Sequence, residues 1–240
     1  MRCVFVGVEY SGKTTLINLL SDYYRHRQQR VHVDDHFTIP DSTLSAESRE
    51  LYLDFPNDVK ERMQRMQLQY HVEVIRNYPH TMISGWHIEE LIYSEIYGED
   101  DESPYYPRYA YRHQRLYEVQ VLESRLPDIV FIHVKANADT IRQRMEADPH
   151  QYQIIKAADV ERLQQRFDDE VDCSLFTDKG RLIQLDTTDK TPTESLDELL
   201  LLSEPLITAG EMALRSIEVP TQEYEVGYEN GVRRLIPKSG

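Results

Sequence analysis

The stretch RCVFVGVEYSGKTT, residues 2–15, decides the fold because it joins three sequence patterns in one short segment. Its apolar start, Cys3 to Val6, predicts a buried strand. Two glycines then predict a tight turn. From Thr14 to Arg27, apolar residues recur every three or four positions, which predicts a helix lying on a sheet. A strand, a glycine turn and a helix in this order are typical of α/β proteins with a parallel sheet.

The turn itself carries chemistry. Gly7 to Thr14 matches the pattern G-x-x-x-x-G-K-[ST], in which backbone N–H groups and the helix dipole hold phosphates. Lys13 can reach the β and γ phosphates of ATP, and the Thr14 hydroxyl can bind Mg²⁺. The predicted nucleotide-binding residues are Gly7, Glu9, Tyr10, Ser11, Gly12, Lys13, Thr14 and Thr15.

The rest of the chain alternates between strand and helix patterns, which predicts parallel pairing with helices on both faces. We therefore expect a three-layer α/β/α sandwich with a five-stranded parallel sheet. Two helices have a clear apolar stripe that we expect to face inward. The stripe of the long helix 57–77 is Val59, Met63, Met66 and Tyr70, and that of the helix 157–172 is Val160, Leu163, Phe167 and Val171.

The end of the chain follows a different pattern. YEVGYENGVRRLIP, residues 224–237, alternates with a period of two around Asn230-Gly231, the strongest short signal of a β-hairpin. We expect this hairpin to add to the sheet edge or to a partner. The long helix and the hairpin both favour a homodimer.

Composition limits the class of partner. The 240 residues carry a formal net charge of -15, which argues against a general nucleic-acid binder. A small phosphorylated ligand needs only a local basic pocket and is not excluded. The sequence has no run of about twenty apolar residues, so we expect no membrane span. Two cysteines and no visible signal peptide lead us to expect a cytoplasmic protein.

Beyond the turn, the chain resembles the P-loop nucleoside and nucleotide kinases, most closely the thymidylate kinase and deoxynucleoside kinase group. WHIEELIYSEIYG, residues 86–98, looks like the segment after their third strand. PDIVFIHVKANADTIRQRM, residues 127–145, is similar to their fourth strand and the start of their lid. Glu9 stands where that group often carries an acid inside the loop. The order of elements agrees over residues 1–210.

The resemblance implies an ATP-dependent kinase of a nucleoside monophosphate or a deoxynucleoside, with Mg²⁺ at the phosphates. It divides the chain into a kinase domain, residues 1–210, with a lid at about 142–158, and a C-terminal extension, residues 211–240. Two alternatives stay open. The chain can be a kinase of another hydroxylated small molecule, such as a metabolite or an antibiotic, or a nucleotide-binding regulatory module with little turnover.

One expected group is missing. In the family, the third strand ends in an acid that is usually followed by arginine, whereas here it ends in Ser84-Gly85. Three replacements are open: Asp34 or Asp35 after the second strand, Glu9 in the loop, and Glu89 or Glu90 on the next helix. We favour Asp35 as the base and as a metal ligand, because strand ends point into the crevice. A phosphate acceptor is already ionised and needs no base.

Positive charge is also needed around the transferred phosphoryl group. Arg142 and Arg144, in the lid, are candidates to clamp it, and the alternative is an ordinary solvated helix face. Arg108 and Arg112 can hold the acceptor's phosphate or neutralise the acidic run 99–102. The family resemblance further implies acceptor contacts from the long helix and the loop. The complete set of predicted acceptor-binding residues is Glu9, Asp34, Arg65, Gln69, Trp86, Arg108 and Arg112.

Overall fold

Five parallel strands form the central sheet in the order β2-β3-β1-β4-β5. The computed structural model describes residues 1–36, 44–98, 121–126, 128–151, 153–217, 224–229 and 232–237, without the side chains of residues 35, 36 and 224–237. The strands are β1 (Arg2–Val6), β2 (His32–His36), β3 (Thr81–Gly85), β4 (Val130–Lys135) and β5 (Leu182–Asp186). The expected five-stranded parallel sheet is thereby confirmed.

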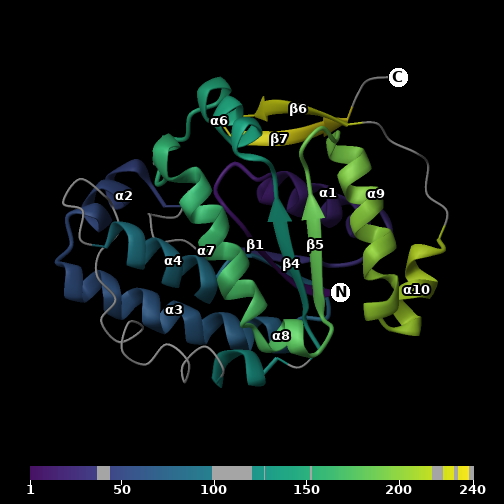
Figure 1. Ribbon diagram of the computed structural model, residues 1–240. Helices are drawn as coiled ribbons and strands as arrows, with labels where there is room; N and C mark the ends of the chain where they lie inside the picture. Colours follow the sequence, from purple (N-terminus) through teal and green to yellow (C-terminus); the bar gives the residue numbers. More distant parts are fainter. Residues whose placement is uncertain are drawn as a thin grey trace.

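The sheet is covered by helices on both faces (Figure 1). Five helices provide most of this cover: α1 (Lys13–His26), α3 (Asn57–Asn77), α4 (His87–Tyr97), α7 (Val160–Asp172) and α9 (Pro192–Ser203). Shorter elements connect or flank them: α2 (Ala46–Leu53), α6 (Ala138–Ala147), η1 (Ala157–Asp159), α8 (Leu175–Asp178), η2 (Glu204–Leu206) and α10 (Ala209–Arg215).

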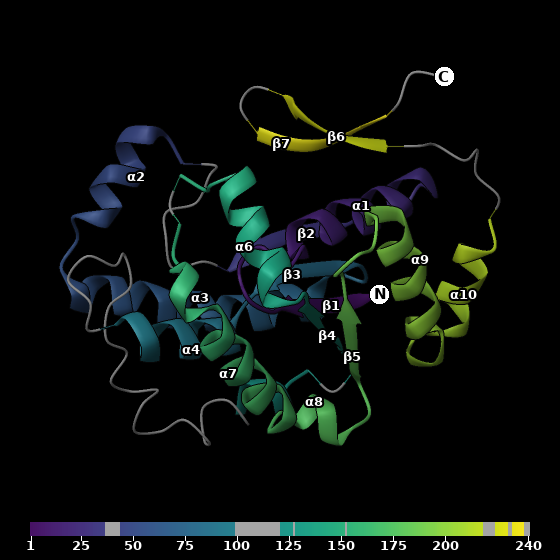
Figure 2. The ribbon, with the colours of Figure 1, turned by 45° about the horizontal axis from the view of Figure 1, so that its top comes forward.

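The central strand β1 shows why two helical layers form. Its side chains alternate, so Val4 and Val6 join one hydrophobic cluster while Cys3 and Phe5 join the other. The first cluster contains residues of α3, α4 and α7, and the second contains residues of α1 and α9. Figure 2 shows the sheet between these two groups of helices. The expected three-layer sandwich is confirmed.

The C-terminal hairpin is a separate element. β6 (Tyr224–Glu229) and β7 (Val232–Pro237) pair antiparallel with each other and form their own two-stranded sheet. The predicted hairpin is confirmed. Of the two places expected for it, addition to a partner stays a prediction, and the edge of the main sheet is wrong. Instead β7 lies beside α1 (Figure 2). No helix among the described residues is long and apolar enough to cross a membrane.

The orientation of α3 differs from the sequence prediction. The stripe expected to face inward is exposed: Val59, Met63, Met66 and Tyr70. The buried residues of this helix are Lys60, Gln64, Leu68, His71, Val72, Val74 and Ile75. The C-terminal half buries apolar groups against the sheet, whereas the N-terminal half turns polar groups inward. The prediction was wrong because it assumed that the apolar stripe of the N-terminal half faces the core, whereas the buried residues of that half are polar.

Candidate active site

The glycine turn lies at the carboxyl end of the central strand, where ligands of open α/β sheets bind. Gly7 has φ of 146° and Gly12 has φ of 103°, values that favour glycine. At Gly7 a Cβ atom would lie 2.1 Å from the Val134 carbonyl oxygen, so the close packing of β1 against β4 also requires glycine there. The backbone of the turn therefore depends on both glycines.

The N-terminus of α1 differs from those of several other helices. Its N-cap is Gly12, which offers no side chain, and its first turn has no acidic residue. By contrast, α6, α8, α9 and α10 are each capped by their own Asn, Ser or Thr side chain. An uncapped helix N-terminus leaves N–H groups and the positive end of the helix dipole for an anion.

Lys13 is folded over the turn from the first position of α1. Its Nζ donates to the Gly7 carbonyl oxygen at 2.5 Å and lies 3.3 Å from the Val8 carbonyl oxygen. The same Nζ is 3.2 Å from Oε1 of Glu89, which lies in the first turn of the neighbouring helix α4. Oε1 of Glu89 also accepts a hydrogen bond from the Gly7 N–H. A carboxylate and an ammonium group therefore meet directly at the turn.

Glu9 points from the turn to the predicted lid. Its Oε2 accepts hydrogen bonds from the N–H groups of Ile154 and Ile155, and its Oε1 lies 2.5 Å from Nδ1 of His150. Tyr10 stacks on the His150 ring with centroids 4.1 Å apart. Partial burial raises the pKa of Tyr10 to about 12, so its hydroxyl stays protonated at neutral pH. These contacts join the turn to residues 150–155.

The two lid arginines have different surroundings. Arg144 donates to the carbonyl oxygens of Tyr10 and Thr187 and to the Thr187 hydroxyl, so it lies against the turn. Arg142 instead donates to Glu161 and to the Ala157 carbonyl oxygen, so it lies against α7. The structure brings only Arg144 of this pair to the turn. Arg108 and Arg112 lie outside the described residues.

The end of β2 carries the two predicted acids. Oδ2 of Asp34 lies 3.3 Å from Nε2 of His71 on α3 and 3.7 Å from Nε2 of His32. The backbone of Asp35 is in register with Ser84, the position that lacks the expected acid. The backbone of Asp35 therefore lies next to Ser84, the position at which the family carries an acid. The side chain of Asp35 is outside the described part of the structure. Among the described residues, no group of three or more His, Cys, Asp or Glu can hold a metal ion.

The predicted acceptor-binding residues of α3 are engaged with other side chains. Arg65 donates to Glu61 one turn earlier, and the Gln69 side-chain oxygen accepts from Arg125 at 2.8 Å. Trp86 is fully buried and donates its indole N–H to the Leu68 carbonyl oxygen, so it is a core residue.

Gln64, the glutamine on the inner face of α3, was not among the residues predicted from the sequence. It is 1% exposed, and neither atom of its side-chain amide has a hydrogen-bond partner among the described residues. Lys60 is buried on the same face, four residues earlier. The available signal was the spacing of Leu68, Val72 and Ile75, which continues the face of Lys60 and Gln64.

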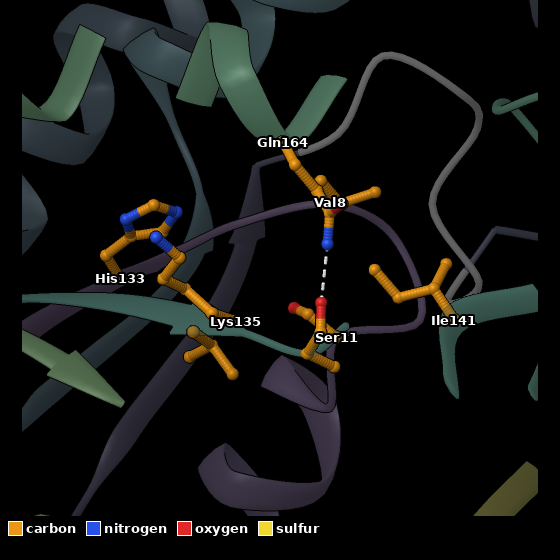
Figure 3. A pocket seen from close by; sticks show the side chains of 8 residues that line it. Val8, Ser11, His133, Lys135, Ile141 and Gln164 are labelled. Carbon is orange, nitrogen blue, oxygen red and sulfur yellow. Dashed lines mark hydrogen bonds between the residues drawn. The ribbon is translucent and has the colours of Figure 1, made fainter. Parts of the chain in front are cut away.

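A small pocket lies behind the turn, lined by Val8, Ser11, His133, Val134, Lys135, Ala136, Ile141 and Gln164 (Figure 3). Its volume of about 10 Å³ suits at most one water molecule, so it is not a nucleotide site. Burial, together with the Lys135 ammonium group, lowers the pKa of His133 to about 4. This histidine is therefore neutral at pH 7 and packs in the core beneath the turn.

The donors at the turn fit Mg²⁺. This ion takes oxygen ligands, usually a few from protein and the rest from phosphates and water. Thr14 is an exposed residue in the first turn of α1, and the Glu89 carboxylate lies beside Lys13. Both are hard oxygen donors.

Comparison with solved structures relates this arrangement to known kinases. The deoxyadenosine kinase from M. mycoides with bound dATP is 13% identical in sequence and superimposes with a TM-score of 0.56, over 84% of this chain and 98% of that chain. Thymidylate kinase from Candida albicans is 14% identical with a TM-score of 0.51, over 85% of this chain and 90% of that chain. The chain therefore has the fold of the P-loop nucleoside and nucleotide kinases, the group that its sequence resembles.

The sequence identity to these solved structures is too low to show more than a shared fold. No protein-family model and no curated protein sequence matches the chain. The comparisons thus establish the fold alone.

Proposed function

We propose that the protein is an ATP-dependent phosphotransferase that acts on a nucleoside monophosphate or a deoxynucleoside. The observation that carries the proposal is the turn at the end of β1, where Lys13 and an uncapped helix N-terminus supply positive charge. This combination of N–H groups, helix dipole and ammonium group suits a polyphosphate.

In the proposed reaction, the γ-phosphoryl group of ATP moves to an oxygen of the acceptor, and ADP leaves. Catalysis then consists of positioning and of stabilising negative charge. The N–H groups of the turn and Lys13 would hold the phosphates, and Thr14 would hold Mg²⁺, which neutralises charge on the phosphates when bound. Arg144, which already lies against the turn, is the better placed of the two lid arginines to add positive charge.

The inner face of α3 supports a nucleoside-type acceptor. The buried amide of Gln64 offers one donor group and one acceptor group, the combination that pairs with the edge of a nucleobase. The family resemblance implied acceptor contacts from this helix, and Gln64 is the glutamine on its inner face. The M. mycoides deoxyadenosine kinase, which shares the fold, has also been solved with the products dCMP and a flexible dCDP bound.

The absence of an acid at Ser84 favours a phosphate acceptor, because a phosphate oxygen needs no base. The position of Asp35 beside Ser84 favours the alternative, a kinase of a hydroxylated small molecule in which Asp35 takes the acceptor's proton. Replacing Asp35 by Asn separates these two reactions. A large loss of kcat supports a hydroxyl acceptor, whereas a small loss supports a monophosphate acceptor.

The proposal is tested first at the turn. We expect Lys13→Ala to weaken ATP binding by roughly 10- to 100-fold, because a buried charge-assisted contact to phosphate is lost. Isothermal titration calorimetry with Mg-ATP measures the change, and Lys179→Ala, on an exposed lysine beyond α8, is the matched control. Equal affinity of the two variants would exclude the turn as the nucleotide site.

Turnover is tested with an acceptor panel of nucleosides, nucleoside monophosphates and sugars, in which ADP release is measured. Phosphorylation of a nucleoside or a monophosphate is the expected result. Phosphorylation of sugars alone would support the alternative kinase. Tight ATP binding without a phosphorylated product from any acceptor would support a regulatory module instead.

A further inference from the structure

Glu89 brings a negative charge to a site built for anions. Its side chain is 12% exposed, and its Oε1 contacts both the Lys13 ammonium group at 3.2 Å and the Gly7 N–H at 3.2 Å. One helical turn later, Tyr93 accepts a hydrogen bond from the Glu9 N–H at 3.1 Å. Helix α4 therefore holds the phosphate-binding turn at two points, and one of these contacts is charged.

Part of this placement follows from local structure. Glu89 lies in the first turn of α4, where the helix dipole favours an acidic side chain. The backbone before it turns sharply, since Trp86 has φ of 109°. The fully buried Trp86 side chain and the buried His87–Glu123 contact fix this turn in the core. The carboxylate is thus presented from a rigid helix start.

The carboxylate has two opposing effects on a triphosphate. It holds the ammonium group of Lys13 at the turn, and it also repels the phosphates, because like charges at this range interact strongly in a partly buried site. A divalent cation bound with the nucleotide would offset this repulsion, because it adds positive charge at the phosphates. The balance of the two effects therefore depends on Mg²⁺.

We propose that Glu89 is the residue that makes nucleotide binding depend on a divalent cation, by occupying Lys13 and repelling the metal-free triphosphate. It thereby supplies from α4 the negative charge that Ser84 cannot supply from the end of β3. This inference rests on the proposed function, because it concerns the same nucleotide site.

The test compares ATP binding with and without Mg²⁺ in three proteins, by calorimetry of the full chain. The proteins are the wild type, Glu89→Gln, and Glu95→Gln as a matched control. Glu95 lies on the same helix and pairs with Arg166 away from the turn, so its substitution removes the same charge at a distance. We expect Glu89→Gln to bind metal-free ATP more tightly and to reduce the enhancement by Mg²⁺ about tenfold, while Glu95→Gln keeps the wild-type enhancement.

Several outcomes would overturn the inference. One is the same Mg²⁺ enhancement in Glu89→Gln as in Glu95→Gln, and another is weaker binding of metal-free ATP to Glu89→Gln. If Glu89→Gln does not fold, which circular dichroism detects, Glu89→Asp replaces it. The shorter side chain draws the charge back from Lys13 and should lower the enhancement in the same direction. A wild type that binds no nucleotide would overturn the proposed function itself, a result distinct from a change in the ratio.

Discussion

Helices α7 and α3 pack on the same face of the sheet but relate to their sequences in opposite ways. In α7 the apolar stripe predicted to face inward is fully buried, and all four of its residues have 0% exposure. In α3 the predicted stripe faces outward, with Met66 67% and Tyr70 55% exposed. Both helices carry a regular apolar stripe, but only one of these stripes contacts the core.

The difference reflects what each helix covers. Helix α7 packs apolar residues against β4 and α4, so burial of its stripe lowers the free energy of the fold. The N-terminal half of α3 turns Lys60 and Gln64 inward, which suits a helix that lines a ligand site. An apolar stripe therefore identifies one face of a helix but does not by itself show that this face points to the core.

The largest effect that would sharpen this comparison is expected in α7. Phe167→Ala should lower the free energy of unfolding by about 3–5 kcal/mol, because it leaves a cavity in the core. Phe167 packs against Tyr93 and His133, with ring centroids 5.9 and 6.1 Å away. Urea unfolding followed by circular dichroism measures the change. A loss below about 1 kcal/mol, the size of a typical single substitution, would show that α7 is not anchored as described.

An intermediate effect, of the opposite sign, is expected in α3. Gln64→Leu should leave stability unchanged or raise it by about 1–3 kcal/mol, because it removes a buried amide without partners among the described residues. At the same time it should weaken acceptor binding about tenfold, since a base edge loses its partner. Thermal unfolding and acceptor titration measure the two quantities.

Gln69→Leu is the matched control for this experiment, because Gln69 lies on the same helix as Gln64 but is exposed and accepts a hydrogen bond from Arg125. It should leave acceptor binding unchanged. If Gln64→Leu destabilises the protein and acceptor affinity stays at the wild-type level, the inner face of α3 is structural, and the contrast with α7 disappears.

The smallest effect is expected on the outer face of α3. Met66→Ser should change the free energy of unfolding by less than about 0.5 kcal/mol, because the side chain is largely exposed. Urea unfolding at low protein concentration, with sedimentation velocity to fix the oligomeric state, provides the measurement. A loss of several kcal/mol would mean that this stripe is covered in solution, for which the predicted homodimer is one arrangement.

The sequence predicted most of what depends on local pattern. The turn from Gly7 to Thr14, the five strands and the C-terminal hairpin follow from spacing and residue type over a few neighbouring positions. The orientation of α3 was also accessible, since Leu68, Val72 and Ile75 mark the face that meets the sheet. The prediction instead followed the N-terminal stripe, where the inward residues are polar.

What could not be predicted depends on contacts between distant segments. Glu89 was only one of several candidate acids, because nothing local shows that its side chain reaches Lys13, 76 positions earlier. The resemblance placed Glu9 among acceptor-binding residues, whereas its carboxylate contacts the N–H groups of Ile154 and Ile155. Such pairings depend on how the loops meet above the sheet, and spacing along the chain carries no information about that.

The close approach at Gly7 has an evolutionary consequence. A methyl group there would lie 2.1 Å from the Val134 carbonyl oxygen, so β1 and β4 would have to separate to admit it. Because β1 is the middle strand, such a separation would split the sheet into two halves. We therefore expect selection to act strongly against any replacement of Gly7, because each one would disturb the pairing of β1 with β4.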